Sequence, residues 1–214
     1  MENENMEINV EKTKKKINIP NILTIARICL VPVFILLMVL APLNEEWNYL
    51  KYVALGVFVV ASVTDWLDGI IARKQGIVTR FGKLMDPLAD KILVASGFIM
   101  LTGMGIVPAW VTAIVVCRDF LLNTIRMFGT EAGTTIAAGV TGKIKTAFQM
   151  LTVVLGLVDT NELFMFIDAG SRMEFGALLL NVGFSISLVF AVIFTVWSCI
   201  DYIAKYSKYI NIAE

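Results

Sequence analysis

The sequence predicts an all-α membrane protein with six transmembrane helices. Apolar residues make up 57% of its 214 residues and charged residues only 17%, whereas soluble domains average about 45–50% and about 25%. A helix rises about 1.5 Å per residue, so roughly 20 residues cross the hydrocarbon core of a bilayer. Five stretches without any charged residue supply such segments, at 28–44, 52–64, 92–117, 146–158 and 175–200.

Turn residues and charges set the number of spans. Gly103, Gly105 and Pro108 interrupt the stretch 92–117 and predict a turn between two helices. With six spans and a cytosolic N-terminus, the loop lysines and arginines lie inside and most loop acids lie outside, as the positive-inside rule requires. Five spans would put the cations near 126–145 outside. The expected spans are about 20–41, 49–72, 82–103, 108–128, 142–159 and 175–203.

The chain is expected to form one domain in the plasma membrane. Residues 1–18 are polar and end in a lysine-rich run, which predicts a basic cytosolic segment rather than a signal peptide. Residues 19–214 then form a multi-pass, six-helix domain with both termini in the cytosol. The net charge is zero, and we expect no nucleic-acid partner. Three scattered cysteines are expected to be buried structural thiols: Cys29, Cys117 and Cys199.

The composition also limits the chemistry. The chain contains no histidine, which excludes a Ser-His-Asp triad, a histidine-ligated zinc and a histidine general base. Any catalysis must therefore use carboxylates, cations, hydroxyls or thiols.

Four aspartates lie where a membrane helix normally avoids charge. Asp65 and Asp68 are three residues apart near the end of the second span, and Asp86 and Asp90 are four apart near the start of the third. Each pair therefore lies on one helix face. The short connection makes the two helices antiparallel neighbours, so we expect the pairs to face each other about 12 Å from the helix ends. The cavity between them would open to the cytosol.

Four converging carboxylates repel one another and need neutralisation. Protonation is one solution, and two divalent cations held by aspartate oxygens are the other. Two metals about 3.5–4 Å apart are the usual arrangement for phosphoryl transfer. Solvated charges at two helix ends would not need to lie two turns deep, so the spacing favours a binding site.

The strongest motif in the chain is Asp65-x2-Asp68-Gly69-x2-Ala72-Arg73-x8-Gly82-x3-Asp86-x3-Asp90. It resembles the signature of the CDP-alcohol phosphatidyltransferase family at all eight positions. The resemblance implies the CDP-alcohol phosphotransferase fold, a homodimer of six-helix subunits and a requirement for two Mg²⁺ or Mn²⁺ ions. The implied reaction is the displacement of CMP from a CDP-linked lipid by an alcohol, with the catalytic domain covering residues 19–214.

The same resemblance implies a role for each position of the motif. The metal ligands would be Asp65, Asp68, Asp86 and Asp90. Asp90 would also act as the general base on the attacking hydroxyl, which is reasonable for a carboxylate beside a metal. The CDP moiety would be bound by Gly69, Ala72, Arg73 and Gly82.

Three polar residues open the first span. Asn21, Thr24 and Arg27 recur every three residues and lie on roughly one side of a helix. They resemble the Asn-x-x-Thr-x-x-Arg start common in this family, which implies that they help to close the nucleotide site. Alternatively, the first two residues begin the helix and the arginine extends to the lipid headgroups.

Further cations indicate the acceptor alcohol. Arg118 and Asp119 interrupt an apolar span, Arg126 follows two turns later, and Lys143 and Lys145 begin the fifth span. Several arginine and lysine donors suit a phosphate group, so we expect the acceptor itself to carry a phosphate. Positive-inside flanking explains the cations at span ends, but it does not explain a charged pair within a span.

This arrangement is similar to the phosphatidylglycerophosphate synthase branch of the family. The substrates implied are CDP-diacylglycerol and sn-glycerol 3-phosphate, although Asp119 replaces the glutamate usual in that branch. Phosphatidylglycerol, inositol phosphate and serine remain alternative acceptors. A cation transporter is a further alternative, because intramembrane aspartates also line ion pathways. The outer halves of spans two and three carry no charge, at 53–63 and 92–103, which favours a one-sided enzyme site.

Overall fold

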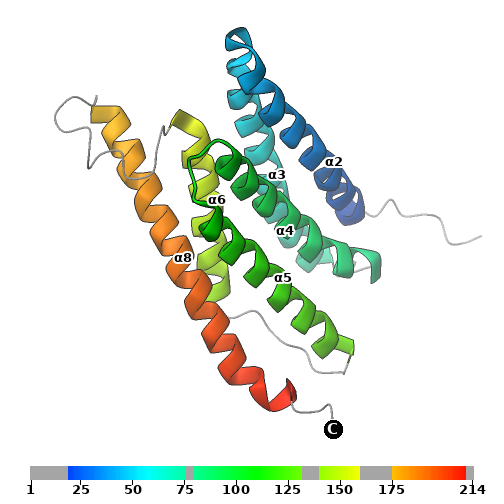
Figure 1. Cartoon of the computed structure of the whole chain (residues 1–214). Helices are drawn as coiled ribbons and strands as arrows, with labels where there is room; N and C mark the ends of the chain where they lie inside the picture. Colours follow the sequence, from blue (N-terminus) through cyan, green and yellow to red (C-terminus); the bar gives the residue numbers. More distant parts are fainter. Residues whose placement is uncertain (1–18, 76–79, 132–139, 160–174, 211–214) are drawn as a thin grey trace, which may run out of the picture.

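A computed structural model gives the architecture of the chain (Figure 1). It describes residues 19–75, 80–131, 140–159 and 175–210. Within these ranges, the side chains at 19–23, 45, 65–75, 80–87, 90, 126–131, 140–141, 159, 175, 203 and 205–210 are not described. The described part is helical: α2 (Ile19–Leu40), η1 (Ala41–Leu43), η2 (Glu45–Trp47), α3 (Tyr49–Gln75), α4 (Arg80–Gly103), α5 (Ala109–Glu131), α6 (Val140–Asp159) and α8 (Phe175–Ile210).

The six long helices confirm the all-α prediction, and each corresponds to one expected span. The main difference is at the end of α8, which continues to Ile210 rather than stopping near 203. Charged residues from Lys205 onward suggest the end of a span. They do not end a helix, however, because lysine is a good helix former in water.

Two helices are apolar and long enough, by length and composition, to cross a membrane. They are α2, over Thr24–Leu43 with η1, and α8, over Gly176–Tyr202. Shorter apolar stretches lie in α3 and α4, at Tyr49–Thr64 and Lys91–Gly103; this survey covers the described residues. Large apolar side chains also cover much of the outer surface, including Leu36, Val39, Val60, Ile186, Ile193, Trp197 and Ile200. Soluble monomers rarely expose apolar surface on this scale.

A glycine-stabilised turn joins α4 to α5, as the sequence predicts. Gly105 has a φ of +77°, a conformation that favours glycine. Its N–H donates to the Thr102 carbonyl at 3.0 Å, and the Ile106 N–H donates to the Leu101 carbonyl at 3.0 Å. This pair of hydrogen bonds is the Schellman ending of a helix. Apolar side chains usually occupy the two positions held here by Leu101 and Ile106, and both residues are buried.

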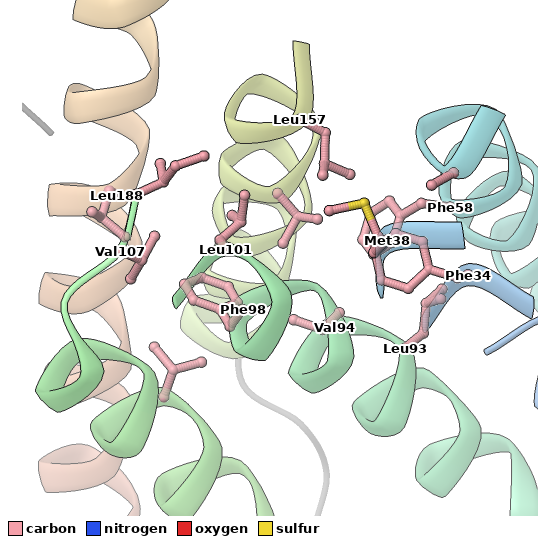
Figure 2. Packing of buried hydrophobic residues seen from close by; sticks show 14 of the residues in the cluster. Phe34, Met38, Phe58, Leu93, Val94, Phe98, Leu101, Val107, Leu157 and Leu188 are labelled. Atoms are coloured by element: carbon pink, nitrogen blue, oxygen red, sulfur yellow. The ribbon is translucent and has the colours of Figure 1, made fainter. Parts of the chain in front are cut away.

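The apolar core runs through the whole bundle and includes buried residues of all six long helices, α2, α3, α4, α5, α6 and α8 (Figure 2). The rings of Phe34 and Phe58 have centroids 5.6 Å apart and are tilted by 50°, a favourable geometry for an aromatic pair. Phe98, Leu101 and Leu157 are fully buried against the same cluster. The core therefore connects the N-terminal helices to the second half of the bundle.

Glycines allow α6 to approach its neighbours closely. A Cβ atom at Gly97 of α4 would lie 2.6 Å from Cγ1 of Val153 in α6. A Cβ atom at Gly156 would lie 2.9 Å from the Leu101 side chain and 3.1 Å from that of Phe184 in α8. Small residues at such crossings are typical of helices packed within membranes.

Helix contacts divide the bundle into two groups. In the first group, α2 packs against both α3 and α4; in the second, α6 packs extensively against α8, which also contacts α5. Contacts of α6 with α3 and α4, and of α5 with α4, join the groups. Figure 1 shows α8 running beside α6 and α5 on the side of the bundle away from α2.

The cysteine prediction is wrong for two of the three residues. Cys29 and Cys117 are exposed on the helix surface, and Cys199 is partly buried. Apolar sequence surroundings do not distinguish a buried position from one on the apolar outer surface of such a bundle. This is why the prediction failed.

Candidate functional site

The four aspartates of the motif lie in two neighbouring helices. Asp65 and Asp68 belong to α3, and Asp86 and Asp90 belong to α4. Their side chains are outside the described set, as are those of Gly69, Ala72, Arg73 and Gly82. Their ligand and nucleotide roles therefore remain predictions, but the backbone register can be derived from the core contacts.

One level of the core provides that register. Phe58 of α3 lies 3.3 Å from a Cβ position at Gly97 of α4, where Val153 of α6 also packs. Phe34 of α2 packs on Phe58 at the same level. We call these four residues the phenylalanine level: Phe34, Phe58, Gly97 and Val153.

The site residues lie at similar distances along their helices from the phenylalanine level. Asp65 is seven residues after Phe58, and Asp90 is seven before Gly97. Seven residues of helix correspond to about 10.5 Å. Because α3 and α4 run in opposite directions, both aspartates lie beyond the core toward the same end of the bundle. That the two pairs face each other stays a prediction, because these side chains are outside the described set.

The first helix reaches the same height. Arg27 is seven residues before Phe34, which again gives about 10.5 Å from the phenylalanine level. Thr24 and Arg27 are each only 2% exposed. Arg27 is therefore inside the bundle, which disfavours the alternative that its side chain extends to lipid headgroups. The side chain of Asn21 is outside the described set.

Hard divalent cations suit the donor set that the motif offers. Carboxylate oxygens are the ligands that Mg²⁺ prefers, with water and phosphate oxygens completing the coordination. Among the side chains that the structure describes, no cluster of three or more His, Cys, Asp or Glu residues could hold a metal. The four aspartates are not part of that set, so the metal prediction rests on their chemistry and register.

A buried ionic network lies at the predicted acceptor site. Nη1 of Arg118 donates to Oδ1 of Asp119 at 2.9 Å, and the ammonium of Lys145 is paired with the same oxygen. Nη2 of Arg118 donates to Oγ of Ser198 in α8. The exposed fractions are 8% for Arg118, 6% for Asp119, 1% for Lys145 and 6% for Ser198. Helices α5 and α6 therefore meet at the buried carboxylate of Asp119, and α8 joins the network through Arg118.

The network contains more positive than negative charge. Among the described side chains, Arg118 and Lys145 bring two positive charges to the one carboxylate of Asp119. Lys91 of α4 is close enough to act electrostatically on both Asp119 and Lys145. Buried charge is costly unless it is paired, so this difference in charge favours an anionic ligand.

Arg118 has unused hydrogen-bond donors for such a ligand. A guanidinium has five N–H donors, and two of them are used for Asp119 and Ser198. Its buried Nε has no hydrogen-bond partner among the described residues. Lys145 has three N–H donors and uses one of them in its ion pair with Asp119.

The other two predicted acceptor cations are placed differently. Lys143 lies on the exposed surface of α6, two residues before Lys145. Arg126 belongs to α5, but its side chain is outside the described set. The structure thus brings together two of the four predicted cations, Arg118 and Lys145.

The network is at the height of the aspartate motif. Lys145 is eight residues before Val153 of the phenylalanine level, or about 12 Å along α6. On α5, Thr112 donates to the Phe98 carbonyl at 3.4 Å, and Asp119 is seven residues further on. Asp90 and Lys91 of α4 are adjacent, so α4 links the two regions directly.

Sequence reasoning missed the contribution of α8. Ser198 reaches Arg118, and two further polar pairs join α6 to α8: Gln149 with Thr195 at 3.5 Å and Thr152 with Ser187 at 3.0 Å. The signal was present, because hydroxyl residues at 187, 195 and 198 recur at helical spacing within an otherwise apolar span. Such residues often form hydrogen bonds between membrane helices.

Comparisons with known proteins show the family of the chain. The family model for CDP-alcohol phosphatidyltransferase matches residues 17–197. The chain is 40% identical to the CDP-diacylglycerol–glycerol-3-phosphate 3-phosphatidyltransferase of Bacillus subtilis over 146 residues, which cover 64% of this chain and 74% of that protein. Proteins of the same name in Rickettsia bellii and Shigella flexneri are 38% identical over 152 residues (69% and 81% of the two chains) and 33% identical over 192 residues (87% and 93%). The chain therefore belongs to the CDP-alcohol phosphatidyltransferase family.

Proposed function

We propose that this protein transfers the phosphatidyl group of CDP-diacylglycerol to sn-glycerol 3-phosphate, with release of CMP. The buried, positively charged network around Asp119 is the observation that carries the choice of acceptor. It supplies an arginine with unused donors, and a phosphate-bearing alcohol would satisfy them. The names of the relatives support the same acceptor.

The reaction follows from the roles proposed for the aspartates. A hydroxyl oxygen of the acceptor attacks the β-phosphorus of CDP-diacylglycerol, and its proton passes to the carboxylate of Asp90. The bond between the β-phosphorus and the bridging oxygen breaks, and CMP leaves with that oxygen. No covalent enzyme intermediate is needed, because positioning and electrostatics suffice for phosphoryl transfer. Two divalent ions held by Asp65, Asp68, Asp86 and Asp90 would stabilise charge on the transferred phosphate and the leaving CMP.

The nucleotide half of the site is assigned to the α2–α3–α4 group. Arg27 is buried at the height of Asp65 and Asp90 and would contact the CDP moiety together with Asn21 and Thr24. Gly69, Ala72, Arg73 and Gly82 complete this half in the proposal. Glycine at two of these positions would allow a large ligand to approach the helix backbone.

The acceptor half is assigned to α5, α6 and α8. Arg118 would hold the acceptor phosphate, with Arg126 and Lys143 as further cations near the same end of the bundle. Lys145 contributes charge while it remains paired with Asp119. Because Lys91 directly follows Asp90, the two halves meet at α4.

Six membrane crossings with both termini in the cytosol are the proposed topology in the plasma membrane. The up-and-down helix order and the apolar outer surface support it. Trp47 and Trp110, which are exposed beside the connections η1–η2 and α4–α5, suit the outer interface. A homodimer is proposed from family membership, and its contact surface would be drawn from this apolar exterior.

The decisive experiment is an acceptor screen with the purified protein. CMP release from CDP-diacylglycerol is measured with glycerol 3-phosphate, phosphatidylglycerol, inositol phosphate or serine, each with Mg²⁺, with Mn²⁺ and with EDTA. We expect release only with glycerol 3-phosphate and a divalent ion. Release with another acceptor would overturn the assignment of the acceptor. Activity in EDTA would overturn the role of metals.

A further inference from the structure

The C-terminal helix contributes a buried hydroxyl to the acceptor network. Oγ of Ser198 accepts a hydrogen bond from Nη2 of Arg118 across the interface between α5 and α8. Ser198 is 6% exposed and Arg118 is 8% exposed, so water does not compete freely for this bond. Ser198 has no part in the mechanism described above.

The guanidinium of Arg118 is held from two directions. Asp119 accepts from Nη1 on the same helix, and Ser198 accepts from Nη2 on a different helix. An arginine side chain has many rotamers, and a single neighbour in its own helix does not fix the plane of the group. Two acceptors on two elements do fix it, and they also fix the direction in which the remaining N–H donors point.

The position of Ser198 is set by a rigid interface. Along α8, Ser187 pairs with Thr152 at 3.0 Å, and Thr195 pairs with Gln149 at 3.5 Å. Ser187 and Ser198 are eleven residues apart, about three helical turns, so they lie on the same face. The contacts with α6 therefore determine the height and rotation at which α8 presents Ser198.

We propose that Ser198 is a positioning residue: it orients Arg118 so that the guanidinium meets the phosphate of the acceptor alcohol. This inference rests on the proposed function. Asp119 alone would leave the guanidinium free to rotate about its pairing, and the geometry of phosphate recognition by arginine depends on the orientation of its planar fork. Through Ser198, α8 becomes part of acceptor recognition.

A Ser198→Ala variant tests the proposal, with Ser185→Ala as the matched control. Both changes remove a buried hydroxyl from α8, but Ser185 has no hydrogen-bond partner among the described residues, whereas Ser198 is a partner of Arg118. We expect Ser198→Ala to raise the KM for glycerol 3-phosphate about tenfold, the value for one hydrogen bond to a charged group. The KM for CDP-diacylglycerol should stay unchanged, and Ser198→Thr, which keeps the hydroxyl, should restore the acceptor KM. Ser185→Ala should leave both KM values unchanged.

The results separate positioning from simple packing. Equal rises in both KM values for Ser198→Ala, or the same rise in acceptor KM for Ser185→Ala, would overturn the proposal. A loss of thermal stability without a change in acceptor KM would also overturn it.

A double-mutant cycle with Arg118→Ala separates this inference from the proposed function. If Ser198 acts through Arg118, Ser198→Ala should have no further effect on the acceptor KM once Arg118 is removed. If Arg118→Ala leaves the acceptor KM unchanged, the proposed role of Arg118 fails, and the positioning role fails with it. If Arg118→Ala raises that KM but Ser198→Ala does not, only the positioning role fails.

Discussion

The two helix groups of this bundle differ in the polar contacts that accompany their apolar packing. The α2–α3–α4 group is joined by apolar side chains, with Phe34, Met38 and Phe58 buried at its centre. The α5–α6–α8 group also has apolar contacts, with Phe148 of α6 stacked on Phe190 and Phe194 of α8. It adds polar contacts between its helices, made by Gln149, Thr152, Thr195 and the network around Asp119. Both groups nevertheless place their proposed site residues at the same end of the molecule.

The difference indicates how each group holds its part of the site. Apolar packing fixes distances between helices but tolerates substitutions of similar volume. Hydrogen bonds and ion pairs between buried side chains specify the rotation of each helix, because each donor needs a particular acceptor. The metal half would then tolerate changes in its core, whereas the acceptor half would be sensitive to the loss of single polar atoms.

The largest expected effect is at the metal half. Asp90→Asn should lower turnover about a thousandfold, because an amide cannot accept the proton of the attacking hydroxyl. Binding of CDP-diacylglycerol should be largely kept, and CMP release together with lipid binding measures both quantities. Glu46→Gln, a matched change on an exposed acid outside the site, should leave turnover unchanged. Normal turnover in Asp90→Asn would remove Asp90 as the base.

The next effect distinguishes the acceptor half from the nucleotide half. Arg118→Ala should raise the KM for glycerol 3-phosphate about a hundredfold. The change removes two charge-assisted hydrogen bonds to the acceptor phosphate, of about 1.5 kcal/mol each. Asp119 keeps its pairing with Lys145, so the protein should still fold. Steady-state kinetics with both substrates measures the effect, and Lys51→Ala on the opposite side of the core serves as the control. A similar rise in the KM for CDP-diacylglycerol would contradict the division into two halves.

A smaller effect should appear where the groups meet. Gly97→Ala would place Cβ 2.6 Å from Val153, a stiff side chain that cannot move aside by a rotamer change alone. We expect a loss of about 1–3 kcal/mol in the free energy of unfolding, measured in detergent. Gly56→Ala, where a Cβ meets nothing within 4 Å, should be neutral or slightly stabilising. Equal stability of the two variants would show that the contact between α4 and α6 can accommodate an added methyl group at Gly97.

The smallest effect concerns the polar interface itself. Thr152→Val removes the hydrogen bond to Ser187 and should lower the free energy of unfolding by about 0.6 kcal/mol, the average for such bonds between membrane helices. Thr124→Val on the exposed face of α5, which loses only a bond to the Phe120 carbonyl, is the control. If Thr152→Val is no less stable than this control, the polar pairs are not what fixes the contact between α6 and α8.

Sequence patterns were sufficient for the elements of the fold. Charge-free stretches and the glycines before Pro108 predicted the six helices and the turn at Gly105. They did not indicate which apolar residues face inward, because the outer surface of this bundle is as apolar as its core. Cys29 and Cys117 show this failure most clearly.

Part of the candidate site could be predicted because charge stands out in an apolar sequence. Charged residues within apolar spans are conspicuous, so Arg118, Asp119 and the aspartate motif stood out. Ser198 did not, because a serine is neutral in an apolar span and its role depends on a partner 80 positions away in the chain. The pairing of Lys145 with Asp119 also required the fold, since spacing in the sequence does not determine which helices are neighbours.

The apolar character of α2 and α8 has a consequence for the synthesis of the chain. These two helices satisfy a length and composition test for membrane crossing within the described residues, and they are the first and last of the bundle. Helices with internal charge insert less readily, since arginine or aspartate at a helix centre costs about 2.5–3.5 kcal/mol on insertion scales. Arg118 and Asp119 enter together as an adjacent pair, but Lys145 and Ser198 reach them only after α6 and α8 have been made. Completion of the acceptor half therefore depends on α8, which is made after α5 and α6, and a chain truncated before α8 lacks one of the two acceptors that hold Arg118.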